Sequence, residues 1–400
     1  MFLVTRYAFP VLISAVSLTL ILVYLASTTG GYDFTGHVIG RDFLNTHLGG
    51  VLISEGRSEV LFQPDTYWSI IKQLHGADYG IHNWSYPPLL WPLSQFLALF
   101  PYFWAYTLWT VMGVALVFVA VRLLGLGWIW GIFICLSPAG MVNILAGQNG
   151  FVFSSLLVIA MVLTHRSRSV SAGLTWAILA IKPHLGICVI PFLLASERYK
   201  TMAFGALFLV TAVTVSIFLY GTGAWWQFLT VTSKQQTTVV ETWQGALMWM
   251  IPSGFMQGRL LGLAIGQAYI LHLILALVAA VVLWLRWPSG RSDIRHHILW
   301  LVLGTLIILP YSFNYDMVMF HFALALWYDR KNELLGAFSI PNLNIMFALL
   351  WLLPWIGSVL AASLSLQVTP LVLLLMLFAT PALGQRGHSS SKTLSGGTGN

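Results

Sequence analysis

Long apolar runs constrain this chain more than any other feature. A transmembrane helix needs about 20 consecutive apolar residues, and stretches near that length recur from the N-terminus almost to the C-terminus. Hydrophobic residues make up 58% of the 400 residues and charged residues only 8%, whereas soluble proteins carry about 25% charged residues. So few charges cannot cover a water-exposed surface. We therefore predict an all-α polytopic membrane protein.

The predicted spans number about twelve, with a range of about ten to thirteen. They lie near residues 7–27, 102–121, 127–146, 150–164, 170–181, 185–195, 201–221, 258–285, 296–311, 316–328, 342–362 and 366–383. Residues 1–383 are expected to form one transmembrane domain. The polar tail 384–400 is rich in Ser and Gly, which predicts a disordered cytoplasmic segment.

The distribution of Lys and Arg predicts the orientation of these spans. Most basic residues fall on one side of the predicted membrane, and that side should be cytoplasmic by the positive-inside rule. Both termini then lie in the cytoplasm, and two long loops, 28–101 and 222–257, lie outside. The first loop holds six of the twelve acidic residues, so we expect the chemistry there. Within it, residues 64–75 have one apolar face and predict a short helix in the membrane interface.

Three predicted hairpins place polar residues at their tips, between spans that are too short to cross the membrane alone. The tips are GQNG with Gln148 and Asn149, IKPHLG with Lys182 and His184, and PYSFNYD with Asn314, Tyr315 and Asp316. All three point to the external side in the predicted topology. Irregular backbone at membrane depth is tolerated only where it lines a cavity. We therefore predict a polar cavity that is open to the outside.

Lys182 is the most informative single residue. A Lys at the centre of a membrane span costs at least about 2.5 kcal/mol on insertion scales, so Lys182 should face a cavity or a partner. The Lys ammonium is also a point charge suited to phosphate. In the alternative reading Lys182 is structural, and Asp316, which has a similar apolar setting, is its partner. Gln148 and Asn149 equally suit hydrogen bonds between helices.

Asp42 follows the first span directly, within the sequence Gly40-Arg41-Asp42-Phe43. A carboxylate at such a position can accept a proton from a hydroxyl group, or it is a solvated loop acid paired with Arg41. Arg259 begins a predicted span on the external side, where it could hold an anion or anchor the helix at the interface. His321 lies inside an apolar helix and could equally be a packed, hydrogen-bonded histidine.

Several classes of function lack support in the sequence. Basic residues form no stripe with interleaved aromatic residues, so nucleic-acid binding is not expected. No P-loop, GxGxxG turn, GxSxG elbow or HExxH motif occurs. Cys135 and Cys188 both lie in apolar runs and form no disulfide framework. The four histidines of the first loop do not have the spacing of a metal site.

The chain resembles glycosyltransferase family 87, a membrane-embedded group that uses polyprenyl-phosphate mannose and has a GT-C architecture. The motifs that carry the resemblance are RDF at 41–43, YPP at 86–88 followed by PL at 92–93, GQN at 147–149, KP at 182–183 and the polar tip 310–316. They occur in the family's order over residues 40–320. The chain departs from the family pattern at His184, where members often carry Gln, and at Tyr315-Asp316, where many carry a His pair.

The resemblance implies a GT-C-like bundle that moves a sugar, mannose in the family, from a polyprenyl-phosphate donor to a hydroxyl group of a lipid-linked or glycan acceptor. Transfer would invert the anomeric centre on the extracytoplasmic face of a bacterial inner membrane. The family's general base maps onto Asp42. We expect the donor phosphate to be held by Lys182, Arg41, Arg259 and His184. The expected substrate-binding residues are Tyr86, Gln148, Asn149, Asn314, Tyr315, Asp316 and His321.

No cofactor is required by this chemistry, and the resemblance leaves the use of a divalent metal open. The expected partners are the lipid-linked donor, the acceptor and membrane lipids. The alternative is a transporter or flippase for a lipid-linked or anionic solute. It would use the same Lys182 and Asp316 but would not need a long first loop. A ligase or polymerase of the O-antigen type would instead carry its large loop late in the chain.

Overall fold

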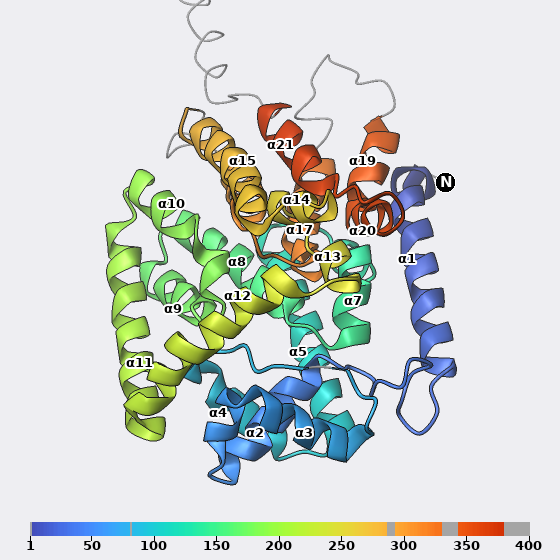
Figure 1. Ribbon diagram of the computed structural model, residues 1–400. Helices are drawn as coiled ribbons and strands as arrows, with labels where there is room; N and C mark the ends of the chain where they lie inside the picture. The colour runs from blue at the N-terminus through green and yellow to red at the C-terminus, as the bar shows by residue number, and fades with distance from the viewer. Residues whose placement is uncertain (1, 81, 286–292, 330–342, 380–400) are drawn as a thin grey trace, which may run out of the picture.

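The computed structural model describes residues 2–80, 82–285, 293–329 and 343–379 (Figure 1). These residues form helices and no strand, and only isolated bridges join Tyr32 to Thr29 and Val38. The all-α prediction is therefore confirmed for the described part of the chain. The tail 384–400 and several of the basic residues on which the predicted orientation rests lie outside the described residues.

Among the described residues, four helical segments are long and apolar enough to cross a membrane. They are α1 (Phe2–Ala26), α5 (Tyr102–Leu123), the segment that begins with α11 (Tyr199–Gln227), and α15 (Ile265–Leu285). Two bent helix pairs, with bends of 63° and 64°, raise the number to as many as six. The pairs are α6 (Ile129–Cys135) with α7 (Pro138–Ala146), and α19 (Leu343–Trp351) with α20 (Leu353–Leu364). The chain is thus a multi-pass membrane protein.

The other helices of the bundle are shorter than the bilayer is thick. They are α8 (Gly150–His165), α9 (Ser169–Leu179), α10 (Val189–Ala195), α14 (Gly254–Leu260), α16 (Ile294–Ile308), α17 (Val318–Asp329) and α21 (Thr369–Ala379). Even α8, with 16 residues, is only about 24 Å long against a hydrocarbon core of about 30 Å. The predicted count of about twelve spans therefore stays a prediction. The span expected at 258–285 is present as α15, which begins at Ile265 because α14 ends at Leu260.

The first loop folds into a small helical module, at the bottom of Figure 1. Its elements are α2 (Phe43–Ser54), η1 (Ser58–Phe62), α3 (Pro64–His75), η2 (Pro88–Leu90) and α4 (Trp91–Ala98). Helices α2 and α4 pack closely, since a Cβ atom on Gly50 would lie 2.0 Å from the carbonyl oxygen of Ser94. The helix expected at 64–75 is present as α3. Its Tyr67 and Ile71 are buried in the core of the module, whereas Leu74 on the same face is 59% exposed, so the location in the membrane interface stays a prediction.

A kink in α11 redirects the chain across the molecule. Gly221 has φ 81° and ψ 160°, which is not helical and which glycine adopts without steric cost. The chain continues through the π-helix η4 (Phe228–Thr232) into α12 (Ser233–Thr242) and α13 (Ala246–Met250). In Figure 1, α12 crosses the front of the molecule between the module and the bundle. The segment 222–257, expected as a second external loop, is thus mostly helical.

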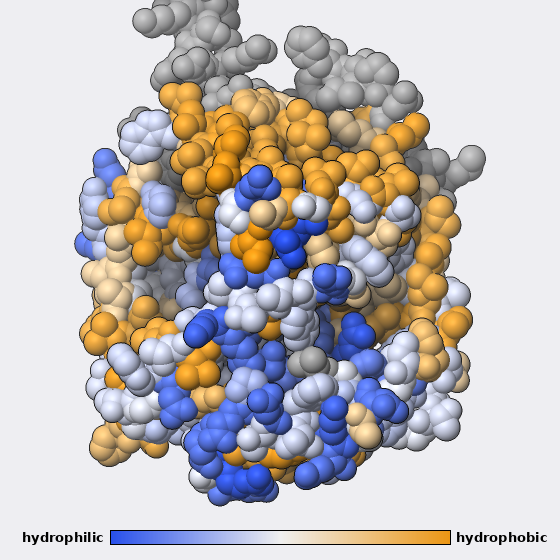
Figure 2. Space-filling model, in the orientation of Figure 1, coloured by the Kyte–Doolittle hydropathy of each residue, from blue (hydrophilic) through white to orange (hydrophobic). Residues whose placement is uncertain are grey.

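The hydropathy of the surface also separates the bundle from the module. Hydrophobic side chains cover the upper part of the face in Figure 2, whereas hydrophilic side chains gather over the α2–α4 module and reach up into its centre. The largest hydrophobic core joins residues of α8, α16 and α17 in the upper bundle, and a second core lies inside the module. The polar residues in the centre mark the region between these two cores.

Candidate active site

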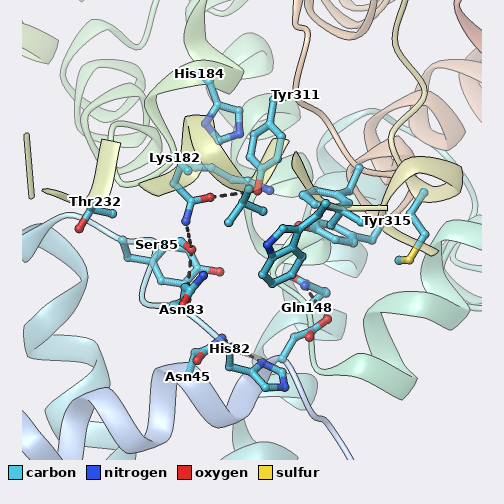
Figure 3. Close-up of a pocket in the computed structure, with 18 of the residues that line it drawn as sticks. Asn45, His82, Asn83, Ser85, Gln148, Lys182, His184, Thr232, Tyr311 and Tyr315 are labelled. Atoms are coloured by element: carbon cyan, nitrogen blue, oxygen red, sulfur yellow. Dashed lines mark hydrogen bonds between the residues drawn. The ribbon is translucent and has the colours of Figure 1, made fainter. Parts of the chain in front are cut away.

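A cavity of about 550 Å³ lies between the module and the bundle, with α12 along one side (Figure 3). This volume is in the range of small-molecule sites, about 300–1,000 Å³. Polar residues reach it from the first loop, from the three hairpin tips and from α12. They include His37, Arg41, Asp42, Asn45, His82, Asn83, Ser85, Tyr86, Gln148, Lys182, His184, Ser233, Gln236, Tyr311 and Tyr315. Segments far apart in the sequence thus bring polar side chains into one cavity, next to apolar ones such as Phe228 and Leu247.

The three hairpin tips meet at Lys182. The Lys182 Nζ atom donates a hydrogen bond to Oδ1 of Asn149 at 3.1 Å and lies 2.5 Å from Oδ1 of Asp316. The centroid of the Tyr315 ring lies 5.0 Å from the same Nζ atom. Lys182 is 7% exposed and Asp316 is fully buried. The predicted convergence of the tips is confirmed, and Asp316 is the partner of Lys182, as the structural alternative required.

Local backbone geometry allows the tips to approach this closely. Gly147 ends α7 in the left-handed conformation, with φ 68°, which favours glycine. A Cβ atom on Gly150 would lie 2.2 Å from the carbonyl oxygen of Tyr315, so a larger residue would push the first tip away from the third. Asn143 joins the same segments, because its Nδ2 donates to the Tyr315 carbonyl at 3.0 Å and its Oδ1 accepts from the Phe151 N–H at 3.2 Å.

The Asp316 carboxylate is fully engaged by protein groups. The Phe313 N–H donates to its Oδ2 atom at 3.1 Å, while Oδ1 faces Lys182. The Asp316 N–H donates in return to the Phe313 carbonyl at 2.9 Å. A buried ion pair offsets its desolvation only when further hydrogen bonds satisfy its remaining atoms. Asp316 therefore holds Lys182 in place, and because the residue is fully buried its carboxylate is not exposed to the cavity.

Asp42 lies at the N-terminal end of α2 and is held more loosely. Its Oδ2 atom accepts a hydrogen bond from Nε2 of Gln148 at 2.8 Å, and Nε of Arg41 lies 4.0 Å from its Oδ1 atom. The side chain makes no capping bond to α2. The backbone is nevertheless fixed, because the Asp42 N–H donates to the Ala146 carbonyl at 2.9 Å. With its side chain 25% exposed, Asp42 presents a carboxylate to the cavity from a fixed position.

Imidazole and phenol rings lie near Asp42. The His82 ring lies 5.6 Å from the Tyr79 ring and 6.5 Å from the His37 ring, measured between centroids. Burial lowers the pKa of His82, against the opposite effect of the Asp42 carboxylate. Burial also raises the pKa of Tyr79 to about 12. Both groups are therefore neutral at pH 7. Among the described residues, no group of three or more His, Cys, Asp or Glu side chains is placed to hold a metal ion.

Most of the predicted site residues lie in or directly behind the cavity. Those that line it are Arg41, Asp42, Tyr86, Gln148, Lys182, His184 and Tyr315. Asn149 and Asp316 lie behind it, next to Lys182. Asn149 also donates to the Tyr86 hydroxyl at 2.6 Å. The Nε2 atom of His184 is buried and has no hydrogen-bond partner among the described residues.

Three predicted site residues neither line the cavity nor contact Lys182. Arg259 lies in the last turn of α14, where its Nη1 atom donates to the Leu263 carbonyl at 3.4 Å. Asn314 donates to the Ser358 hydroxyl at 3.3 Å. His321 is fully buried in α17, with ring nitrogens 3.0 Å from the Met317 carbonyl oxygen and 2.9 Å from that of Trp351. Packing explains His321, as the alternative reading had it, and these positions give no geometric support to substrate contacts.

The cavity also contains residues that the sequence reasoning missed. Gln236 of α12 donates to the Ser85 hydroxyl at 2.7 Å and accepts from the Tyr311 hydroxyl at 3.1 Å. It therefore ties α12 to the first loop and to the third tip. The available signal was the polar run KQQTT at 234–238, in a chain that is otherwise apolar. Other polar lining residues that were not predicted include His37, Asn45, His82, Asn83, Thr232, Ser233 and Gln244.

Comparison with known proteins identifies the family. The model of glycosyltransferase family 87 matches residues 84–310, which is more than half of the chain. No curated protein and no solved structure gives a significant match. The matched segment includes the first two hairpin tips, Lys182 and α12. The chain therefore belongs to glycosyltransferase family 87 and is a glycosyltransferase.

Proposed function

We propose that this glycosyltransferase moves a sugar, mannose by its resemblance to the family, from a polyprenyl-phosphate donor to a hydroxyl group of a lipid-linked or glycan acceptor. The observation that carries the proposal is the pairing of groups across one cavity. Asp42 offers a partly exposed carboxylate on one side, and Lys182 offers a buried ammonium on the other. Asp42 lies outside the segment matched by the family model, and this geometry is what supports its proposed role.

In the proposed reaction Asp42 is the general base. It takes the proton of the acceptor hydroxyl as that oxygen bonds to the anomeric carbon. The bond between the anomeric carbon and the phosphate oxygen breaks, and the lipid phosphate leaves with the electron pair. A single displacement of this kind inverts the anomeric centre. The hydrogen bond from Gln148 occupies one oxygen of Asp42 and orients the other toward the acceptor.

Lys182 is the proposed ligand of the leaving phosphate. An ammonium has three N–H donors, of which Asn149 and Asp316 take two. The third is available to a phosphate oxygen on which negative charge develops as the bond breaks. Arg41, with a side chain that is 40% exposed, supplies a second and more mobile cation. The unpartnered Nε2 of His184 is a further candidate contact.

The position of the cavity suits a lipid-linked donor. It lies where the hydrophobic upper surface meets the hydrophilic module (Figure 2). A polyprenyl chain can stay in the bilayer while its sugar phosphate enters the cavity. We place this side of the protein on the extracytoplasmic face of a bacterial inner membrane, in line with the Lys and Arg distribution.

The proposal is tested with purified protein in detergent. Polyprenyl-phosphate mannose, the corresponding glucose donor and a nucleotide-linked mannose are each supplied with a glycolipid and glycan extract, and labelled product is measured. We expect transfer from a lipid-phosphate donor and none from the nucleotide sugar. Transfer only from the nucleotide sugar, or from none of the three donors, would overturn the proposal.

A further inference from the structure

We propose that a second groove, between α3 and α12, binds the acceptor as an extended oligosaccharide. This inference rests on the proposed function, because it names the class of acceptor that the same site would use. The groove encloses about 660 Å³. It is lined by Asp65, Trp68, Asn83, Lys234, Gln235 and Trp243, among others. None of these six residues has a role in the transfer step.

The lining of the groove suits a carbohydrate chain. A sugar ring presents apolar C–H faces and several hydroxyl groups, so it binds to aromatic rings flanked by amides and carboxylates. Trp68 and Trp243 supply large rings that also carry a polar N–H. Asp65, Asn83 and Gln235 supply groups that accept or donate hydrogen bonds. The groove therefore has the apolar and polar contacts that an oligosaccharide needs.

Trp68 is held in position before any ligand binds. Its Nε1 atom donates to the Tyr79 carbonyl at 3.3 Å, and the Lys72 ammonium lies 3.8 Å from its ring centroid. Trp243 differs, because no hydrogen bond or ring contact involves its side chain in the described part of the chain. A fixed indole ring reduces the entropy cost of binding. An indole ring without partners is available to contact a sugar ring. The two indoles thus supply one rigid and one adaptable surface.

The groove is continuous with the cavity that holds Asp42. Asn83, Val239 and Trp243 line both of them. Helix α12 forms the shared wall: Ser233 and Gln236 face the cavity, whereas Lys234 and Thr238 face the groove. A glycan whose terminal hydroxyl reaches Asp42 can therefore continue past Asn83 into the groove.

The position of the groove favours a sugar chain over a lipid tail. Its walls are α3, in the hydrophilic module, and the polar helix α12. Figure 2 shows hydrophilic side chains gathered over the module, below the hydrophobic surface. Among the described residues that line the groove, Lys234 is the only Lys or Arg, and the acidic Asp65 lies in the same lining. The groove therefore lacks the cluster of cations that a polyanion site needs. A neutral, hydroxyl-rich chain is the occupant that satisfies these conditions.

The test measures how affinity depends on the length of the glycan. Mannose oligosaccharides from monosaccharide to pentasaccharide, and a matched glucose series, are titrated against the full-length protein in detergent. In the wild type the affinity for one series should rise with length. Trp68→Ala and Gln235→Ala should each weaken the binding of the longest members about 3- to 10-fold, the effect of losing one aromatic or hydrogen-bond contact. Binding of the monosaccharide should not change.

The matched control is Trp226→Ala, which removes an exposed indole, 70% accessible, from the end of α11, outside the groove. It should leave the length dependence intact. Length-independent binding in the wild type would overturn the inference, as would unchanged binding of long oligosaccharides in both groove variants. The assay does not depend on donor chemistry. If the protein transferred no sugar from any lipid phosphate, the proposed function would fail. The binding data would still show whether the groove binds oligosaccharides.

Discussion

Asp42 and Asp316 are two aspartates beside one cavity, but the protein holds their carboxylates in different ways. Asp316 is 1% exposed at its side chain and engages Lys182 and the Phe313 N–H. Asp42 is 25% exposed and receives one hydrogen bond, from the neutral amide of Gln148. A carboxylate whose oxygens are both occupied can position a neighbour, whereas one with an available oxygen can take a proton. The difference supports the proposal that Asp316 positions Lys182 and that Asp42 takes the proton.

The largest expected effect on stability comes from breaking the buried pair. Asp316→Asn or Lys182→Met leaves one charge buried and uncompensated, which typically costs about 3–5 kcal/mol. Thermal unfolding in detergent should therefore shift clearly downward for either variant. Asp42→Asn is the matched control, and its unfolding temperature should stay at the wild-type value because the side chain caps no helix. Equal unfolding temperatures for Asp316→Asn and Asp42→Asn would break the comparison.

The double variant Lys182→Met with Asp316→Asn separates stability from activity. Removing both charges of a buried pair is often neutral for stability, and the Asn side chain can still accept the Phe313 N–H. The free energy of unfolding should return to within about 1–2 kcal/mol of the wild-type value. Sugar transfer should remain about 100-fold slower than in the wild type, because the ammonium group that would bind the leaving phosphate is gone. Recovery of activity together with stability would show that Lys182 does not contact the donor.

A smaller effect is expected at Gln148, which orients Asp42. Gln148→Ala removes one hydrogen bond to a charged group, worth about 1.5 kcal/mol, so kcat should fall about 10-fold with little change in unfolding temperature. Gln148→Glu instead places a like charge beside Asp42, which disfavours a second ionised carboxylate. The loss of activity on acidification should then begin at a higher pH than in the wild type. An unshifted pH–rate profile for Gln148→Glu would contradict this role.

The smallest effect should come from Arg41→Gln. The Arg41 guanidinium lies 4.0 Å from Asp42 and its side chain is 40% exposed, and exposed pairs contribute about 0–1 kcal/mol. We expect kcat/KM to fall a few-fold at low salt and less at high salt, since screening weakens the same contacts. A loss as large as that of Lys182→Met would mean that Arg41 is the main phosphate ligand.

Much of this arrangement could be predicted from the sequence, because membrane spans and polar interruptions are local patterns. Apolar runs indicated the all-α membrane fold, and the isolated charges of Lys182 and Asp316 indicated a buried polar centre. The number of spans could not be obtained in the same way. Packing between distant segments sets the short lengths of helices such as α8 and α16. It also sets the bends of 63° and 64° in the two helix pairs.

The polar wall of the cavity was harder to predict for a physical reason. Residues 233–242 are polar and follow an apolar span, which predicts part of an external loop, although they form α12. Gln236 becomes a cavity residue only through contacts with Ser85 and Tyr311, which lie 151 and 75 positions away. The bond between Gln148 and Asp42 spans 106 positions and was equally invisible. Such pairs are set by tertiary structure.

The most direct test of the account is single-turnover transfer by Asp42→Asn with the lipid-phosphate donor already bound. If Asp42 is the general base, donor affinity should stay within about twofold of the wild type, while the transfer step slows by about 10²- to 10⁴-fold. Asp42→Glu, which keeps a carboxylate on a longer side chain, should retain part of the rate. Transfer by Asp42→Asn at the wild-type rate, with the donor bound normally, would contradict the account.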